Sequence, residues 1–209
     1  MRKESRCDFV FDFGGVVIKW RNNHPIYDYI ADRYGVPRLE LRAVLEAALP
    51  DLESNQVGVS EMLEGSLARF GKTLRAGDDP NELWAWPFAR LAKLRVGTVE
   101  VVKSLRRRGY RAFLFSNTSF PHAQFVRKVG WDRFFDDFVG SCELGCVKPA
   151  PEAFEAALQR FGVSPGNAAY IDDREENVRG AKRYGIRWAL RFTSVARLRE
   201  DIAPLLASD

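Results

Sequence analysis

The sequence predicts an α/β protein with a doubly wound, Rossmann-like parallel sheet and an inserted α-helical cap domain. Three observations support this. A short apolar run ends in an aspartate near the N-terminus; the following seventy or so residues read as helical; and strand-like and helix-like segments alternate from residue 98 onward. We expect the core to comprise residues 1–18 and 96–209, and the helical cap to comprise residues 19–95.

The first strand lies in the run from Phe9 to Ile18, and it is apolar on both of its faces up to Asp12. Such a pattern is typical of a strand at the centre of a parallel sheet. Gly14 and Gly15 follow almost at once and allow the backbone to turn sharply and to approach a ligand closely. A buried carboxylate costs free energy unless it is paired or bound to a metal, so Asp12 needs a partner.

The next stretch reads as four helices, and no strand is expected to interrupt it. Trp84 and Trp86 fit the interior of this helical unit better than a binding platform. Trp20, where the chain leaves the first strand, is a candidate for substrate contact, as are Arg21 and Asn22. The expected helices are 24–34, 38–49, 60–70 and 81–94, with breaks at Gly35-Val36-Pro37, Leu49-Pro50-Asp51, Gly58 and Gly77-Asp78-Asp79-Pro80.

The second half of the chain supplies the remaining strands, and polar residues follow several of them. The expected strands are 112–115, 138–140, 168–171 and 188–191. The expected helices are 98–108, 121–129, 151–161, one that follows Asp172-Asp173 and runs to Tyr184, and 195–206. Ser116-Asn117 follows the first of these strands, Lys148-Pro149 comes after the second, and Asp172-Asp173 follows the third. Because the carboxyl ends of parallel strands share one sheet edge, these residues should converge with Asp12.

Composition restricts the function classes. Apolar residues make up 46% and charged residues 29% of 209 residues, which is ordinary for a globular protein, and the net charge is +4. No segment has the length of a membrane span and the N-terminus lacks an apolar signal, so we expect a cytoplasmic protein with no membrane or nucleic-acid partner. Cys7, Cys142 and Cys146 show no CxxC spacing, which argues against a zinc site or a disulfide framework.

Four segments in order resemble the motifs of the haloacid dehalogenase superfamily, most of whose members are Mg²⁺-dependent phosphohydrolases. Among its members the sequence looks most similar to glucose-1-phosphate phosphatases and to the N-terminal domains of soluble epoxide hydrolases. The resemblance implies a phosphatase with a small helical cap that acts through an aspartyl-phosphate. The four segments are Asp12-Phe13-Gly14-Gly15-Val16, Phe115-Ser116-Asn117-Thr118, Lys148-Pro149-Ala150-Pro151-Glu152-Ala153-Phe154 and Ile171-Asp172-Asp173-Arg174-Glu175-Glu176-Asn177.

The chemistry of phosphoryl transfer gives each acidic residue a role. Asp12 can offer one oxygen to Mg²⁺ and keep the other as the nucleophile. The backbone carbonyl of Gly14 and the carboxylates of Asp173 and Asp172 complete the expected metal site, since Mg²⁺ prefers oxygen ligands. Asn177 is expected to orient one of these carboxylates from behind.

The phosphate itself should be held by neighbouring donors. We expect Ser116 to donate its hydroxyl, Asn117 its backbone N–H, and Gly15 a close backbone approach. Lys148 is expected to neutralise the charge that the phosphate shares with Asp12. The predicted cofactor is Mg²⁺, and the predicted substrate is a small phosphorylated metabolite, with sugar phosphates as the leading class.

One position departs from the pattern: most phosphatases of the superfamily carry a second aspartate two residues after the nucleophile, and here that residue is Gly14. General acid–base catalysis typically contributes 10²–10⁴-fold. Three interpretations remain open: a substrate with a stabilised leaving group, another residue or a metal-ordered water in the same role, or a phosphosugar-binding protein with little turnover. A haloacid dehalogenase is disfavoured by the Asp172-Asp173 pair, and a phospho-accepting signalling receiver by the position of Asp12 on the first strand.

Overall fold

The computed structural model describes residues 6–20 and 25–206, and its central feature is a five-stranded parallel sheet in the order β5-β4-β1-β6-β7. This confirms the predicted α/β class with a doubly wound sheet. The first strand of the chain occupies the centre, as its two apolar faces predicted. The strands are β1 (Asp8–Phe11), β4 (Ala112–Ser116), β5 (Asp137–Gly140), β6 (Ala168–Asp172) and β7 (Trp188–Arg191).

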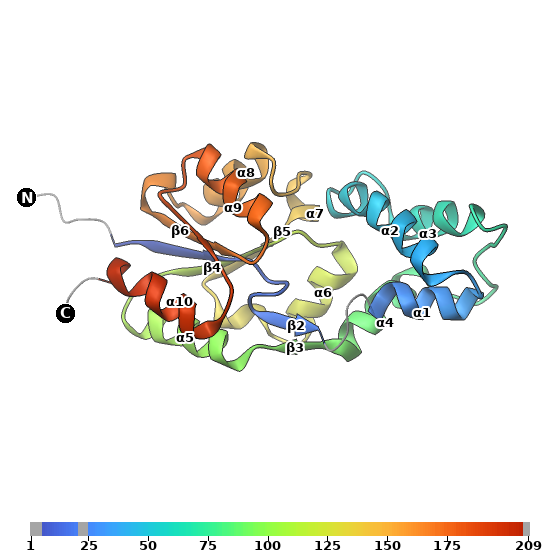
Figure 1. The fold of residues 1–209 in the computed structure, drawn as a ribbon, viewed down its shortest axis with the longest axis horizontal. Helices are drawn as coiled ribbons and strands as arrows, with labels where there is room; N and C mark the ends of the chain where they lie inside the picture. The colour runs from blue at the N-terminus through green and yellow to red at the C-terminus, as the bar shows by residue number, and fades with distance from the viewer. Residues whose placement is uncertain (1–5, 21–24, 207–209) are drawn as a thin grey trace, which may run out of the picture.

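Helices cover both faces of this sheet, which is the arrangement that right-handed crossovers between parallel strands produce. On one face lie α8 (Pro151–Phe161) and α9 (Glu175–Tyr184). On the other lie α5 (Val96–Arg107), α6 (Phe120–Lys128) and α10 (Val195–Ile202) (Figure 1). Each crossover helix returns the chain to the amino edge, so the carboxyl ends of the strands all open on the opposite edge.

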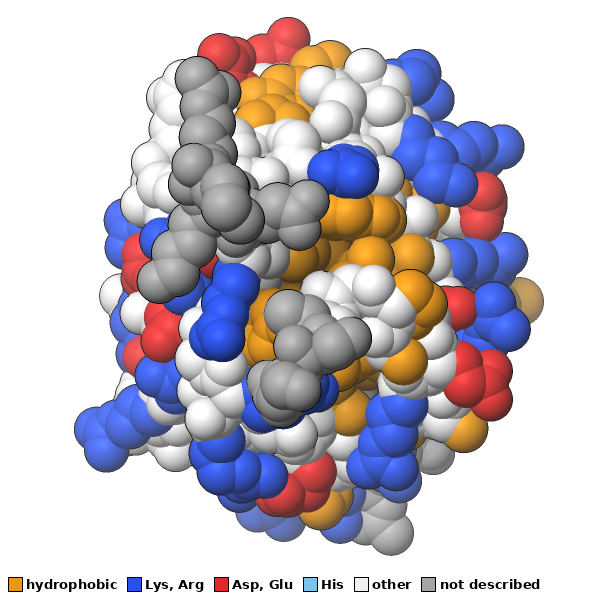
Figure 2. All heavy atoms as spheres, turned by 90° about the vertical axis from the view of Figure 1, so that its left-hand side faces the viewer, with side chains coloured by type: hydrophobic (Ala, Val, Ile, Leu, Met, Phe, Trp, Pro, Cys, Tyr) orange, Lys and Arg blue, Asp and Glu red, His pale blue; other side chains and the backbone are white. Residues whose placement is uncertain are grey.

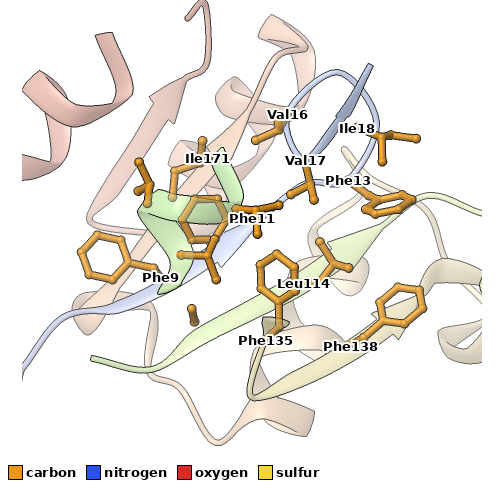
Figure 3. Packing of buried hydrophobic residues seen from close by; sticks show 14 of the residues in the cluster. Phe9, Phe11, Phe13, Val16, Val17, Ile18, Leu114, Phe135, Phe138 and Ile171 are labelled. Carbon is orange, nitrogen blue, oxygen red and sulfur yellow. The ribbon is translucent and has the colours of Figure 1, made fainter. Parts of the chain in front are cut away.

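Alternate residues of β1 pack into two different hydrophobic clusters. Phe9 and Phe11 point into the cluster under α5 and α10, together with Leu114 and Ile171 from the neighbouring strands (Figure 3). Val10, between them, packs into the cluster under α8 and α9. Because the strand is buried on both faces, its register is strongly specified and Asp12 is held at a fixed place just beyond its end.

Four helices form a separate helical unit with a hydrophobic cluster of their own, whose fully buried residues include Ile30, Leu41, Leu45 and Leu63. Figure 1 shows this unit at the end of the molecule opposite both chain termini. The four are α1 (Pro25–Tyr34), α2 (Arg38–Glu53), α3 (Val59–Ala68) and α4 (Pro80–Leu91).

An antiparallel ribbon joins the helical unit to the sheet. It is formed by β2 (Ile18–Trp20) and β3 (Ala92–Leu94), in which Ile18 pairs with Leu94. The expected helix 81–94 was therefore wrong at its end: α4 stops at Leu91 and the chain becomes extended. The ribbon supports our proposal that the cap comprises residues 19–95, with 1–18 and 96–209 as the core.

The break expected at Leu49-Pro50-Asp51 was also wrong, because α2 continues through Pro50 to Glu53. A proline inside a helix removes one backbone hydrogen bond and crowds the preceding turn. Pro50 therefore loses its own N–H bond, but the helix continues one turn beyond it, where Leu52 is buried, so packing of the helix end outweighs this cost. The backbone N–H of Ser54 donates to the Pro50 carbonyl at 2.9 Å, and its hydroxyl donates to the same oxygen at 2.7 Å.

Short elements that the sequence did not predict complete the fold. A four-residue helix, α7 (Ser141–Leu144), follows β5 and contacts α2 of the helical unit. Two single turns of 3₁₀-helix, η1 (Asp132–Phe134) and η2 (Pro165–Asn167), lie elsewhere in the described part of the core. The end of the expected helix 195–206 is also a 3₁₀ turn, η3 (Ala203–Leu205).

The face of the core that lies farthest from the helical unit carries charges of both signs. Figure 2 shows Lys and Arg side chains around its rim, with Asp and Glu between them and an apolar strip near the middle. Among the described residues, no helix is long and apolar enough to cross a membrane.

Candidate active site

An ion pair lies at the carboxyl edge of the sheet, where β1 and the loop after β5 meet. The Nζ atom of Lys148 lies 2.6 Å from Oδ1 of Asp12 and 3.3 Å from Oδ2 of Asp172. It also donates to the Phe115 carbonyl at 3.0 Å. The Lys148 side chain has no exposed surface, so all of its donors point at groups of the protein or into the site.

Asn117 positions the backbone of Lys148. Its Nδ2 donates to the Lys148 carbonyl, and its Oδ1 accepts from the Lys148 N–H, both at 2.9 Å. This pair of hydrogen bonds connects the end of β4 to the loop that carries the lysine. Sequence reasoning considered Asn117 only as a backbone donor, because the partner of its side chain lies 31 residues away. Ser116, which like Asn117 lines a cavity at this edge of the sheet, donates its hydroxyl to the Asn117 carbonyl at 3.2 Å.

The two adjacent aspartates after β6 differ in environment. Asp172 is fully buried, and its Oδ2 accepts from Tyr170, from Asn177 at 2.9 Å and from Lys148. Its Oδ1 accepts from the backbone N–H of Arg174 at 2.8 Å. Asp172 is thus engaged on both oxygens, whereas Asp173 is less buried and faces the cavity. The structure places Asn177 behind Asp172, to which it donates; its expected role of orienting a metal-binding carboxylate stays a prediction.

Gly15 makes room for Asp173. Its φ of +75° is a conformation that residues with a side chain rarely adopt, and a Cβ at this position would lie 2.0 Å from Oδ2 of Asp173. Gly14 is different: a Cβ there would meet nothing within 4 Å. The backbone at Gly14 therefore does not exclude a larger side chain, and a carboxylate could be accommodated at that position.

Burial sets the ionisation of this cluster. It raises the pKa of Asp12 to about 7, although the Lys148 ammonium opposes the rise. Burial also raises the pKa of Asp173, and the charge of Asp172 adds to the effect. For Lys148, burial alone would lower the pKa, but Asp12 and Asp172 reverse that and keep it above its usual value. Three carboxylates thus share one ammonium group.

The donor set fits a divalent cation that prefers oxygen. Asp12, Asp172 and Asp173 each offer a carboxylate oxygen, and these atoms all lie within 4.8 Å of one another. Carboxylate repulsion at such distances is relieved by a cation, and Mg²⁺ is bound by one or two carboxylates, with waters and phosphate oxygens in the other positions. Gly14 lies beside them in the wall of the same cavity.

A cavity of about 440 Å³ opens above these residues, and the helical unit forms its far wall. That wall is mostly apolar, and Glu53 is its acidic residue. Sequence reasoning did not identify Glu53, because the break expected at Leu49-Pro50-Asp51 placed it in a linker. No motif marks the wall, whose members lie on three helices. They include Tyr27, Leu49, Leu52, Glu53, Trp84 and Phe88.

Hydrogen bonds close the wall against the core. Nε1 of Trp84 donates to Oγ of Ser119 at 3.0 Å, and Nε2 of His122 lies 3.1 Å from the Trp84 carbonyl. The Ser141 hydroxyl donates to the Glu53 carbonyl at 2.7 Å and accepts from the Thr118 N–H at 2.9 Å. The helical unit is therefore held over the sheet edge.

The structure does not describe the side chains of three residues that the sequence proposed for substrate contact. The backbone of Trp20 pairs with Ala92 in the ribbon, but its side chain is outside the described part of the chain, as are Arg21 and Asn22. The suggestion that Trp20 contacts substrate stays a prediction. His122, on α6, lines the cavity and stacks on Phe88 at 4.3 Å between ring centres.

Comparison with known proteins places the chain in a family. The model of the haloacid dehalogenase-like hydrolase family matches residues 9–185, so the chain belongs to that family. The motif resemblance and the prediction of a hydrolase are thereby confirmed. The match covers the first strand, the helical unit and every strand end that carries a candidate residue.

Phosphatase names recur among the relatives of this chain. A phosphorylated carbohydrates phosphatase of Thermotoga maritima is 24% identical, covering 85% of this chain and 81% of its own. A sesquiterpene phosphatase, astK, of Aspergillus oryzae is 27% identical, covering 85% of both. A glyceraldehyde 3-phosphate phosphatase of Methanopyrus kandleri is 42% identical, but over only 28% of this chain and 26% of that protein. These names support the prediction of a phosphoric monoester hydrolase.

A solved structure shows the same fold. A haloacid dehalogenase family enzyme of Bacteroides thetaiotaomicron, in complex with magnesium and inorganic phosphate, superposes with a TM-score of 0.70. The two chains are 20% identical, and the match covers 93% of this chain and 99% of the other. At this identity the likeness establishes the fold alone.

Proposed function

We propose that this protein is a Mg²⁺-dependent phosphomonoesterase that hydrolyses a small phosphorylated metabolite through an aspartyl-phosphate on Asp12. The observation that carries the proposal is the ion pair of Asp12, at the floor of the cavity, with the buried Lys148 behind it and Asp173 beside it. A nucleophilic carboxylate, a buried cation and a further carboxylate at one spot are what phosphoryl transfer to an acidic residue requires.

The residues of the chain have separable tasks in this reaction. One oxygen of Asp12 attacks the phosphorus atom, and the bond from phosphorus to the leaving oxygen breaks. Lys148 offsets the negative charge that attacker and phosphate bring together. Ser116 and Asn117 border the same floor and would contact phosphate oxygens. Water then attacks phosphorus, releases phosphate and restores the Asp12 carboxylate.

Asp12, Asp173 and the Gly14 carbonyl would hold the metal, with Asp172 supporting it. When bound, Mg²⁺ neutralises charge and orients the phosphate. The raised pKa values of Asp12 and Asp173 support this assignment, because burial and then the neighbouring carboxylates disfavour their charged forms, and a bound cation would relieve both effects.

We propose sugar phosphates as the leading substrate class. The carbohydrate-directed names of two relatives support this choice, and a cavity of about 440 Å³ suits a small metabolite. The apolar wall supports a second class, phosphates of an apolar organic group, which the sesquiterpene phosphatase also suggests. The wall offers aromatic and aliphatic surface from Leu49, Leu52, Trp84 and Phe88.

Hydrolysis of p-nitrophenyl phosphate tests the central proposal. We expect activity with Mg²⁺, its loss with a chelator, and a fall in kcat of about 10³-fold or more for Asp12→Asn. Asp137→Asn is the matched control, since Asp137 lies at the opposite, amino end of its strand in a surface ion pair with Arg160. Equal rates for wild type and Asp12→Asn would refute Asp12 as the nucleophile.

A substrate panel distinguishes the classes. Hexose 1-phosphates, hexose 6-phosphates, glyceraldehyde 3-phosphate and a farnesyl monophosphate should be compared by kcat/KM at fixed Mg²⁺. Preference for the farnesyl ester would favour the apolar class over sugars. Binding of sugar phosphates without turnover of any ester would contradict the phosphatase proposal and favour a phosphosugar-binding protein.

A further inference from the structure

We propose that Glu53, at the C-terminal end of α2, is the proton donor and acceptor of this phosphatase. It would replace the aspartate that most phosphatases of the superfamily carry at the position of Gly14. The inference rests on the proposed function, and it assigns the missing acid–base role to the helical unit rather than to the sheet. The juxtaposition that carries it is that Glu53, Asp12 and Gly14 line one cavity from opposite sides.

The backbone at Glu53 is fixed while its side chain is free to act. The Glu53 carbonyl accepts from the Ser141 hydroxyl at 2.7 Å. The same hydroxyl accepts from the backbone N–H of Thr118, the residue after Asn117. Among the described residues, the Glu53 carboxylate has no hydrogen bond or ion pair, although it lies in the cavity wall. A carboxylate that holds no structural partner and faces a cavity is available to a ligand.

Charge around Glu53 is compatible with proton transfer near neutral pH. Burial raises the pKa of Glu53 to about 7, while the Lys148 ammonium and the Arg174 guanidinium lower it. A carboxyl group of that kind exchanges its proton efficiently near pH 7. The other titratable groups that face it or share its cavity are Tyr27 on α1, Asp12 after β1, His122 on α6 and Asp173 after β6.

The proposed proton transfers balance over one cycle. As the phosphorus–oxygen bond to the leaving group breaks, the protonated Glu53 gives its proton to the departing oxygen and becomes a carboxylate. In the second step Glu53 takes a proton from the attacking water, whose oxygen bonds to phosphorus as the bond to Asp12 breaks. Phosphate leaves, and both Asp12 and Glu53 return to their starting states.

Two esters of similar shape separate this role from a structural one. Phenyl phosphate has a poor leaving group and p-nitrophenyl phosphate a good one, so loss of the acid should affect the first far more. For Glu53→Gln we expect kcat/KM to fall about 10²-fold on phenyl phosphate and only a few fold on p-nitrophenyl phosphate. The decline of wild-type kcat/KM for phenyl phosphate above pH 7 should disappear in the variant.

The second step has its own signature. Without a base to activate water, Glu53→Gln should release about one equivalent of p-nitrophenol per enzyme in a rapid burst and then turn over slowly, as phosphorylated Asp12 accumulates. Glu40→Gln is the matched control, because Glu40 is an exposed residue on the same helix. It should leave both substrates and both phases unchanged.

A rescue variant tests the assignment directly. Because a Cβ at Gly14 meets nothing within 4 Å, Gly14→Asp can carry the carboxylate that other members of the superfamily have there. We expect Gly14→Asp, added to Glu53→Gln, to restore hydrolysis of phenyl phosphate at least tenfold. Rescue by a carboxylate at a second position is not expected if Glu53 only supports the fold.

The outcomes are distinguishable from those of the proposed function. If Asp12→Asn is inactive while Glu53→Gln slows both esters equally, shows no burst and is not rescued, the role of Glu53 is overturned and the phosphatase stands. The same holds if Glu53→Gln behaves as wild type. If Asp12→Asn keeps wild-type rates, the proposed function fails whatever the Glu53 variants show.

Discussion

The sheet edge and the helical unit contribute to the same cavity in different ways. At the sheet edge, the Nζ atom of Lys148 lies 2.6 Å from an Asp12 oxygen and 3.3 Å from an Asp172 oxygen. These contacts leave the three side chains little conformational freedom. In the helical unit, Glu53 and the apolar wall face the same space from helices with a separate hydrophobic cluster. The comparison suggests that the chemistry of phosphoryl transfer is set by the sheet and the choice of leaving group by the helices.

The largest effect on activity should come from removing the buried Lys148 ammonium at the sheet edge. Replacement Lys148→Met keeps an unbranched side chain one atom shorter and leaves Asp12 and Asp172 without their ammonium partner. We expect kcat/KM to fall about 10³-fold or more on every substrate, because the missing charge is needed whatever the leaving group is. Steady-state kinetics on p-nitrophenyl phosphate and phenyl phosphate measures this, with circular dichroism to verify the fold.

Lys103→Met is the control for that prediction, since Lys103 is a partly exposed residue of α5 that pairs with Glu100 and lies over the Phe134 ring, far from the site residues. A surface ion pair contributes little, so its loss should leave both activity and stability almost unchanged. A loss of kcat/KM in Lys148→Met that differed greatly between the two esters would contradict the assignment of leaving-group choice to the helices. The sheet edge would then discriminate between leaving groups.

Most of the sheet edge could be predicted from the sequence, and the reason is geometric. Polar residues directly after buried strands end up together, because parallel strands share one carboxyl edge. Asp12 and Asp173 were identified in this way, and Lys148 as a residue of the chain after the next strand that can reach the same edge. The contacts of Asn117 with Lys148 and of Tyr170 with Asp172 were not, since they depend on how separate loops pack rather than on a motif.

The wall of the cavity could not be predicted, for two physical reasons. Its residues are scattered over three helices and have no spacing of their own, so only the packing of those helices brings them together. Further, Pro50 indicated a helix end, but packing beyond it, where Leu52 is buried, outweighs the cost of a proline in α2. That single error removed Glu53 from consideration.

A smaller effect is expected where the two regions meet, at Trp84. In Trp84→Phe, the indole N–H that bonds Ser119 is lost, and a buried hydroxyl of the core loses its partner. We expect a loss of about 3 kcal/mol in the free energy of unfolding, and a rise in KM that exceeds the change in kcat. Denaturant unfolding and steady-state kinetics measure these two quantities.

Trp86→Phe provides the comparison, because Trp86 lies two residues further along α4 with 47% of its surface exposed. Its ring contacts Tyr29 and Arg90 rather than the core, so its truncation should change KM very little. Similar effects of the two variants on KM would mean that the contact between Trp84 and the core does not govern substrate binding.

The smallest effect concerns acid stability at His122, which connects the two regions. Burial lowers the pKa of His122 to about 4, although the Trp84 carbonyl favours the protonated ring. The unfolded chain, with a histidine pKa near 6.5, therefore binds more protons than the folded chain between pH 6.5 and 4, and stability falls as the pH drops through that window. From pH 7 to 5 this amounts to about 2 kcal/mol.

His122→Gln keeps an N–H donor for the Trp84 carbonyl but cannot titrate. Buried carboxylates such as Asp12 and Glu53 act in the opposite sense, because their raised pKa values disfavour the folded state as the pH rises. The difference in unfolding free energy between wild type and variant removes these shared contributions. That difference should shrink by about 2 kcal/mol between pH 7 and 5, and a constant difference would mean that the His122 ring is solvated between Phe88 and Trp84.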